Sequence, residues 1–152
     1  MSSLANAAAL LAAIGLGLMS GALLAEGALL VPFWRSLQPA DFLAWYRKYA
    51  GLLQGFFGPL EVVAIVLAIA AAALDWVNEG DGRYWLASSA ILGLAVLAVF
   101  PIYFQRVNTS FRTGSIAIDR VQSELQQWSR WHWGRTTLAL AAFSNAVVAL
   151  AA

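Results

Sequence analysis

The sequence predicts an all-α fold, an antiparallel up-and-down four-helix transmembrane bundle with helical extensions in its cytoplasmic loops. Hydrophobic residues make up 61% of the 152 residues and charged residues only 11%, whereas a soluble domain carries about 25% charged residues. Four stretches are long and apolar enough to cross a bilayer core, which takes about 20 helical residues. The seven tryptophans lie at or near the ends of these stretches, as expected for side chains that prefer the headgroup level.

The four predicted spans cover residues 4–33, 52–76, 85–104 and 135–152, and we expect a single domain over residues 1–152. The first stretch has no basic segment before it and is longer than the apolar part of a signal peptide. We therefore expect it to be a retained span. A soluble helical bundle is the alternative for all four stretches, but its surface would have almost no charge to present.

The first and third connections are predicted to be partly helical. Pro39 and Asp41 indicate a helix start with Asp41 as the N-cap. The aromatic residues that follow, at positions 42, 45, 46 and 49, have the spacing of a helical stripe at the membrane interface. After Ser115 no proline interrupts the chain before the fourth span. The pattern there predicts one long helix that rises from the cytoplasmic surface into the membrane.

The basic residues predict the orientation of the bundle. Eight of the nine Lys and Arg residues lie in or beside the first and third connections, namely Arg35, Arg47, Lys48, Arg106, Arg112, Arg120, Arg130 and Arg135. Only Arg83 lies on the other side. Because loops rich in Lys and Arg stay in the cytoplasm, both termini are predicted on the non-cytoplasmic side. The net charge of +1 gives no case for nucleic acid as a partner.

Two carboxyl groups, Glu26 and Glu61, lie well inside predicted spans, away from their ends. Each is about seven to nine residues from the cytoplasmic end of its span, a depth of roughly 10 Å in a helix. The two groups can therefore lie at one level. Pro59 and the glycines beside it predict a kink next to Glu61 and a cavity there, since irregular backbone at this depth must line protein or water. The alternative is a packing kink without a cavity.

The other spans bring polar groups to the same face of the membrane. Leu125, Trp128, His132, Arg135 and Ala139 share one face of the fourth helix, and Arg135 is placed to pair with Glu26 or Glu61. The third span adds Tyr103, Gln105 and Asn108. Polar groups that converge from four helices indicate a binding or catalytic site. The alternative is structural, with these groups holding the bundle together.

The segment from Trp128 to Arg135, with Asn108 before it, resembles the anthrone oxygenase-like family of small four-span membrane proteins. The stretch that ends Val-Pro-Phe-Trp at Trp34 and the Phe-Gly-Pro of residues 57–59 are similar too. The resemblance implies the four-helix fold and an oxygenase that converts anthrones to anthraquinones with dioxygen. It also implies roles for His132, Asn108, Trp128 and Arg135, whereas Glu26 and Glu61 come from the analysis of the spans.

An oxygenase-like oxidoreductase that acts on a flat, hydrophobic aromatic molecule is the first function we consider. His132 is the candidate base because imidazole titrates near neutral pH, and Arg135 or Asn108 would stabilise the developing oxyanion. Aromatic side chains are expected to bind the ligand, namely Phe33, Phe57, Tyr103, Phe104 and Trp128. No cofactor motif is evident: there is no phosphate-binding glycine motif and no cysteine.

Other readings of the same residues stay open. Glu26, Glu61 and His132 form a candidate site for a divalent metal, and His132 as sole axial ligand would suit haem. Buried glutamates are also candidates for a proton relay in a transporter or small channel. A non-catalytic membrane subunit or lipid-binding module is the third class. The lipid bilayer is an expected partner, and a homo-oligomer is left open.

Overall fold

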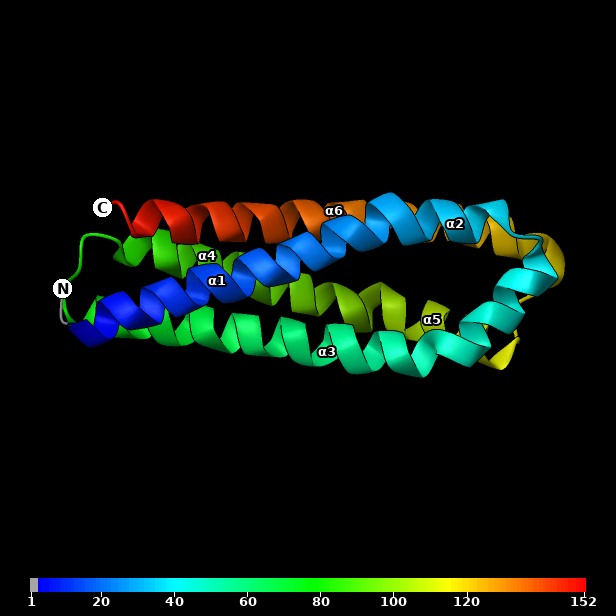
Figure 1. The fold of residues 1–152 in the computed structure, drawn as a ribbon, viewed down its shortest axis with the longest axis horizontal. Helices are drawn as coiled ribbons and strands as arrows, with labels where there is room; N and C mark the ends of the chain where they lie inside the picture. The colour runs from blue at the N-terminus through cyan, green and yellow to red at the C-terminus, as the bar shows by residue number, and fades with distance from the viewer. Residues whose placement is uncertain (1–2) are drawn as a thin grey trace.

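The computed structural model describes residues 3–152 and confirms the predicted all-α four-helix bundle. Figure 1 shows four long helical stacks that run antiparallel, up and down, with both ends of the chain at one end of the bundle. In chain order the elements are α1 (Ser3–Ala25), the π-helical turn η1 (Glu26–Leu30), α2 (Val31–Ser36), α3 (Pro39–Val77), α4 (Arg83–Val99), the π-helical turn η2 (Phe100–Phe104), α5 (Gln105–Thr113), the 3-10 turn η3 (Ile118–Arg120) and α6 (Val121–Ala149).

Within residues 3–152, three helical stretches are long and apolar enough to cross a membrane, namely Ser3–Ser36, Pro39–Val77 and Arg83–Thr113. They contain the first three predicted spans and make the chain an integral membrane protein. Helix α6 is not one of them, because polar side chains such as His132 and Arg135 lie in its middle. It nevertheless packs along α1 and α4. The fourth span, residues 135–152, and the orientation of the termini stay predictions.

Helix α3 joins the predicted loop helix and the second span into one element. Its 39 residues would extend over about 58 Å, nearly twice the roughly 30 Å of a bilayer core. The helix continues through Pro59 and begins at Pro39, with Gln38 as its N-cap and no capping side-chain bond. The prediction of Asp41 as N-cap was therefore wrong. Proline is well suited to the first helical position, so the helix starts two residues before Asp41.

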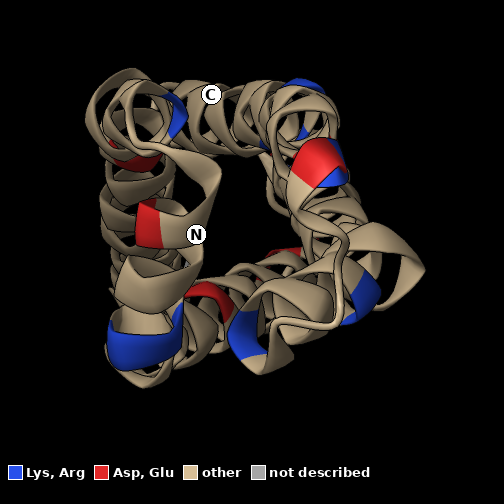
Figure 2. Cartoon of the chain, turned by 90° about the vertical axis from the view of Figure 1, so that its right-hand side faces the viewer, with Lys and Arg blue, Asp and Glu red and all other residues tan. Residues whose placement is uncertain are grey.

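The bundle has two hydrophobic cores that differ in composition. The core near the termini is rich in alanine and leucine, and small residues let helices approach closely. The core at the opposite end is aromatic and includes Trp34, Phe42, Phe111 and Trp128. Trp34 and Trp128 lie in edge-to-face contact with ring centroids 5.4 Å apart, and both are buried inside the bundle. Figure 2 views the bundle from this aromatic end, with the Lys and Arg positions and the Asp and Glu positions marked along the helices.

Two π-helical turns lie between the cores, and the sequence analysis did not predict them. In η1 the N–H of Val31 donates to the carbonyl of Glu26, and in η2 the N–H of Gln105 donates to that of Phe100. Each turn is associated with a proline: Pro32 follows η1 by two residues, and Pro101 is the second residue of η2. Proline has no N–H and so removes one regular helical bond, which favours a local rearrangement of this kind. Such turns often occur at functional sites.

Candidate active site

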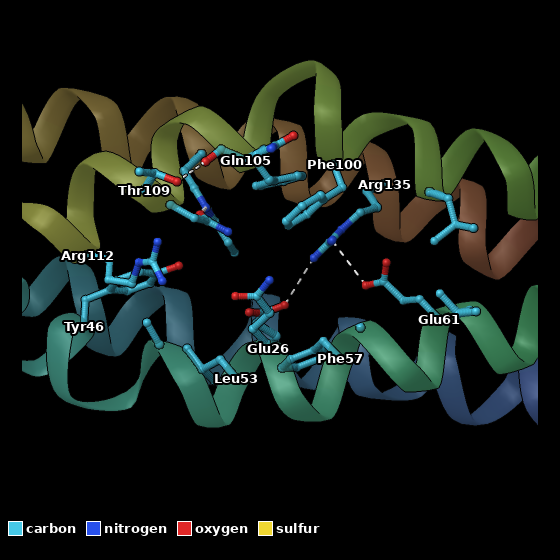
Figure 3. A pocket seen from close by; sticks show the side chains of 18 residues that line it. Glu26, Tyr46, Leu53, Phe57, Glu61, Phe100, Gln105, Thr109, Arg112 and Arg135 are labelled. Carbon is cyan, nitrogen blue, oxygen red and sulfur yellow. Dashed lines mark hydrogen bonds and ion pairs between the residues drawn. The ribbon is translucent and has the colours of Figure 1, made fainter.

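A cavity of about 450 Å³ lies at the level where the two cores meet. Helix α3 forms one wall, η2 and α5 form the opposite wall, and η1 and α6 contribute polar side chains between them (Figure 3). The lining residues are Glu26, Tyr46, Ala50, Leu53, Gln54, Phe57, Gly58, Glu61, Val62, Leu97, Phe100, Phe104, Gln105, Asn108, Thr109, Arg112, Trp128 and Arg135. The volume falls within the range of small-molecule sites.

Three charged side chains meet at one end of this cavity. The guanidinium of Arg135 lies between two carboxylates, with Nη2 3.4 Å from Oε2 of Glu26 and Nη1 3.2 Å from Oε1 of Glu61. Figure 3 shows both contacts. The three residues are only 4–6% exposed, so each charge needs the others as partners. The prediction that Arg135 pairs with Glu26 or Glu61 is thus confirmed. Arg135 pairs with both residues because the two carboxyl groups lie at one level.

Each carboxylate contacts Arg135 through one oxygen only. No hydrogen bond from residues 3–152 reaches the second oxygen of Glu26 or of Glu61. Both residues line the cavity, and the plane of the guanidinium is also held by Phe104, whose ring centroid is 4.5 Å from Cζ of Arg135. The cluster therefore offers a ligand two carboxylate oxygens and one oriented cation.

His132 lies directly behind this cluster and is completely buried. Its Nε2 is 2.8 Å from the carbonyl oxygen of Leu23. A carbonyl can only accept, so Nε2 carries the proton and Nδ1 of the neutral ring accepts from Nη2 of Arg135, 3.3 Å away. The ring stacks on Trp128 at a centroid distance of 5.0 Å. His132 is close to Glu26, at 3.6 Å from Nδ1 to Oε2, but it is not among the residues that line the cavity.

The predicted aromatic residues divide into two groups. Phe57, Phe104 and Trp128 line the cavity, and so does Phe100. Phe33 does not: its side chain is 43% exposed and packs edge-on against Trp45. Tyr103 is buried but also lies outside the lining, because neighbouring helical positions differ by about 100° and Phe104 faces the cavity. The hydroxyl of Tyr103 donates to Glu124 at 2.9 Å instead.

Asn108 is at the cavity, as predicted, and it positions another lining residue. Its Oδ1 accepts a hydrogen bond of 2.9 Å from Nε1 of Trp128, which ties α5 to α6. Four polar residues that line the cavity were not predicted from the sequence, namely Tyr46, Gln54, Thr109 and Arg112. The spacing of Tyr46 predicts a place in an interfacial stripe, but its side chain is only 5% exposed and faces inward.

The metal site of Glu26, Glu61 and His132 stays a prediction. Among residues 3–152, no three His, Cys, Asp or Glu side chains are grouped as metal ligands. Glu26, Glu61 and His132 do come together, but the guanidinium of Arg135 lies between the two carboxylates and hydrogen-bonds to the ring. A side-chain cation therefore occupies the position that a divalent ion would need.

Comparison with known proteins adds a family match. A family model described as anthrone oxygenase matches residues 45–144, from the first part of α3 to the second half of α6. The matched range contains Glu61, Asn108, His132 and Arg135, whereas Glu26 in η1 precedes it. No curated protein and no solved structure matches the chain.

Proposed function

The chain belongs to the anthrone oxygenase family, and from this premise we propose that it is a membrane-embedded oxidoreductase that oxidises a flat aromatic molecule with dioxygen. The observation that carries the proposal is the Arg135 guanidinium, held by two buried carboxylates, on an aromatic-lined cavity. The family name supports an anthrone as the substrate class, and the cavity supports a small hydrophobic ligand.

The reaction of an anthrone with dioxygen needs two protons to be removed from one carbon atom. The methylene carbon of the central ring loses both hydrogens and gains one oxygen atom from O₂, and the second oxygen atom leaves as water. The hydrocarbon supplies all the electrons, so the overall balance of anthrone and O₂ to anthraquinone and water requires no other reductant. The residues of the cavity must therefore bind the ring system, accept a proton and stabilise negative charge.

Glu26 takes the first proton in this proposal. Its Oε1 has no hydrogen-bond partner among residues 3–152 and its residue lines the cavity, so this oxygen is free to reach a ligand. Its Oε2 lies 3.6 Å from Nδ1 of His132, and the lone pair of that nitrogen accepts from Nη2 of Arg135. His132 thus orients Arg135 behind Glu26 and is not itself the proton acceptor. General base catalysis of this kind contributes about 10²- to 10⁴-fold.

Arg135 stabilises the charge that proton removal creates. When the methylene proton leaves, negative charge spreads onto the oxygen of the anthrone, and a cation held in place before the reaction favours this state. The carbanion then transfers its electrons to O₂ and forms a carbon–oxygen bond, which gives a hydroperoxide after protonation. Loss of the second proton from the same carbon breaks the oxygen–oxygen bond, so the carbonyl forms and water leaves.

The experiment is to measure oxygen uptake and quinone absorbance with purified protein and a hydroxylated anthrone, with the spontaneous oxidation subtracted. We expect Glu26→Gln to lower turnover about 100-fold, because an amide cannot accept the proton. The matched control is Glu61→Gln, which keeps an oxygen for Arg135 and is expected to lose less than about tenfold.

Equal loss in the two variants would show that Glu26 is not the base. A wild-type protein that binds the anthrone but does not raise the rate above the spontaneous oxidation would contradict the proposed reaction. That result would favour the non-catalytic ligand-binding alternative.

A further inference from the structure

We propose that the ligand of the cavity carries a carboxylate, which binds Arg112 while the aromatic rings extend toward Arg135. The inference rests on the proposed function and narrows its substrate class to acidic, flat aromatic molecules. It starts from the two arginines that line the cavity, because their surroundings differ.

Arg112 has no partner of opposite charge, in contrast to Arg135. In the part of the chain that the structure describes, the ion pairs within 4.0 Å that involve a cavity residue all include Glu26 or Glu61, and none includes Arg112. The side chain of Arg112 makes no hydrogen bond to residues 3–152 either. Figure 3 shows Arg112 and Tyr46 together at the end of the cavity opposite Glu61. Arg112 is exposed, so this unpaired cation stands at the open side of the cavity, where it is available for an anionic group of the ligand.

The neighbours of Arg112 are neutral and polar. Thr109 and Asn108 precede it by three and four residues and therefore lie on the same face of α5, and all three line the cavity. Tyr46 faces them from α3, and no residue in the range 3–152 hydrogen-bonds its hydroxyl. This end of the cavity thus has an arginine and a free hydroxyl as donors, whereas Glu61 lies at the opposite end and Glu26 lies between the two ends beside Arg135 (Figure 3). The end with Arg112 is suited to an anion.

The positions of Phe104 and Arg112 along one wall of the cavity fit one ligand. Phe104, which contacts the guanidinium of Arg135, precedes Arg112 by eight residues, about 12 Å along a helix axis. Three fused aromatic rings with a carboxylate at one end can extend over such a distance. The charge of Arg135 is already shared by two carboxylates, so the acidic group of the ligand is better placed on Arg112, and the ring oxygen on Arg135.

The test is a binding measurement that needs no turnover. Anthraquinone-2-carboxylate and its neutral carboxamide are titrated into the protein in a phosphate-free maltoside detergent, and quenching of tryptophan fluorescence gives the two affinities. We expect the wild type to bind the carboxylate about tenfold tighter than the carboxamide, as one charge-assisted contact provides. Arg112→Gln should remove this preference and leave the affinity for the carboxamide unchanged.

The matched control is Arg106→Gln. Arg106 is on the same helix and is exposed, as Arg112 is, but it lies outside the cavity lining, so this variant should keep the preference for the carboxylate. Equal wild-type affinities for the two probes, or a preference that survives Arg112→Gln, would overturn the inference. A lipid phosphate offers the same kind of charge. If short-chain phosphatidylglycerol bound more tightly than the carboxylate, and Arg112→Gln abolished its binding, Arg112 would hold a lipid headgroup and the inference would fail.

The outcome is separable from that of the proposed reaction. A wild type that shows no carboxylate preference but takes up oxygen with the anthrone would overturn this inference alone. Absence of oxygen uptake together with an intact carboxylate preference would overturn the oxidation but keep the ligand class.

Discussion

Replacement of Arg135 by methionine is the perturbation that most severely tests the buried cluster. Methionine keeps much of the apolar length of the side chain and removes the guanidinium. The change breaks the contacts of 3.4 Å and 3.2 Å to Glu26 and Glu61, and also the hydrogen bond to His132. Two carboxyl groups that are 5% and 4% exposed are left without a counter-charge.

The magnitude follows from the burial of these groups. Breaking a buried ion pair by removing one partner costs about 3–5 kcal/mol, because the other charge stays buried. At about 2–4 °C per kcal/mol for a chain of this size, the midpoint of thermal unfolding should fall by about 6–20 °C. Thermal unfolding of the purified protein in one detergent, followed by circular dichroism, measures the change.

Two further variants show whether the cause is the unpaired charge. Addition of Glu26→Gln and Glu61→Gln to Arg135→Met removes the buried charges, and the triple variant should recover to within about 2 kcal/mol of the wild type. Arg130→Met, at an exposed position of the same helix, should change stability by less than about 0.5 kcal/mol. A single variant as stable as the wild type, or a triple variant no better than the single one, would refute the reasoning.

Two other predictions follow from the packing and from the distribution of charge. Gly27→Ala places a Cβ about 3.0 Å from the ring of His132, so turnover should fall about tenfold or more as the ring shifts. Gly21→Ala, whose Cβ meets no atom within 4 Å, should leave turnover unchanged. Equal loss of turnover in the two variants would contradict the role given to the packing around His132. Since the chain has no cysteine, Ser115→Cys and Ala152→Cys can each be labelled in intact cells with a membrane-impermeant thiol reagent. Only Ala152→Cys should react if the termini face outward, and the reverse pattern would invert the orientation.

Much of the fold could be predicted from the sequence because it follows from hydropathy and helical spacing. The first three spans are set by apolar runs, and the depth of Glu26 and Glu61 follows from counting residues along them. The face of α6 that carries Trp128, His132 and Arg135 is buried as its spacing predicted. A carboxyl group inside a span requires a partner, so the meeting of the two glutamates with Arg135 could also be anticipated.

The finer geometry of the site depends on local backbone changes that leave little trace in the sequence. The turns η1 and η2 alter the helical hydrogen bonding near Pro32 and at Pro101. No periodicity predicts where Phe33, after η1, and Tyr103, within η2, point. The role of His132 depends on a bond to the carbonyl of Leu23, a main-chain group that no motif specifies.

A structure of the protein with anthraquinone-2-carboxylate bound is the most direct test that the cavity is the active centre. The account predicts the rings between Phe57 and Phe104, with a ring oxygen about 3 Å from the guanidinium of Arg135. A ligand found on the lipid-facing surface of the helices, with the contacts of Arg135 to Glu26 and Glu61 unaltered and the cavity empty, would contradict it.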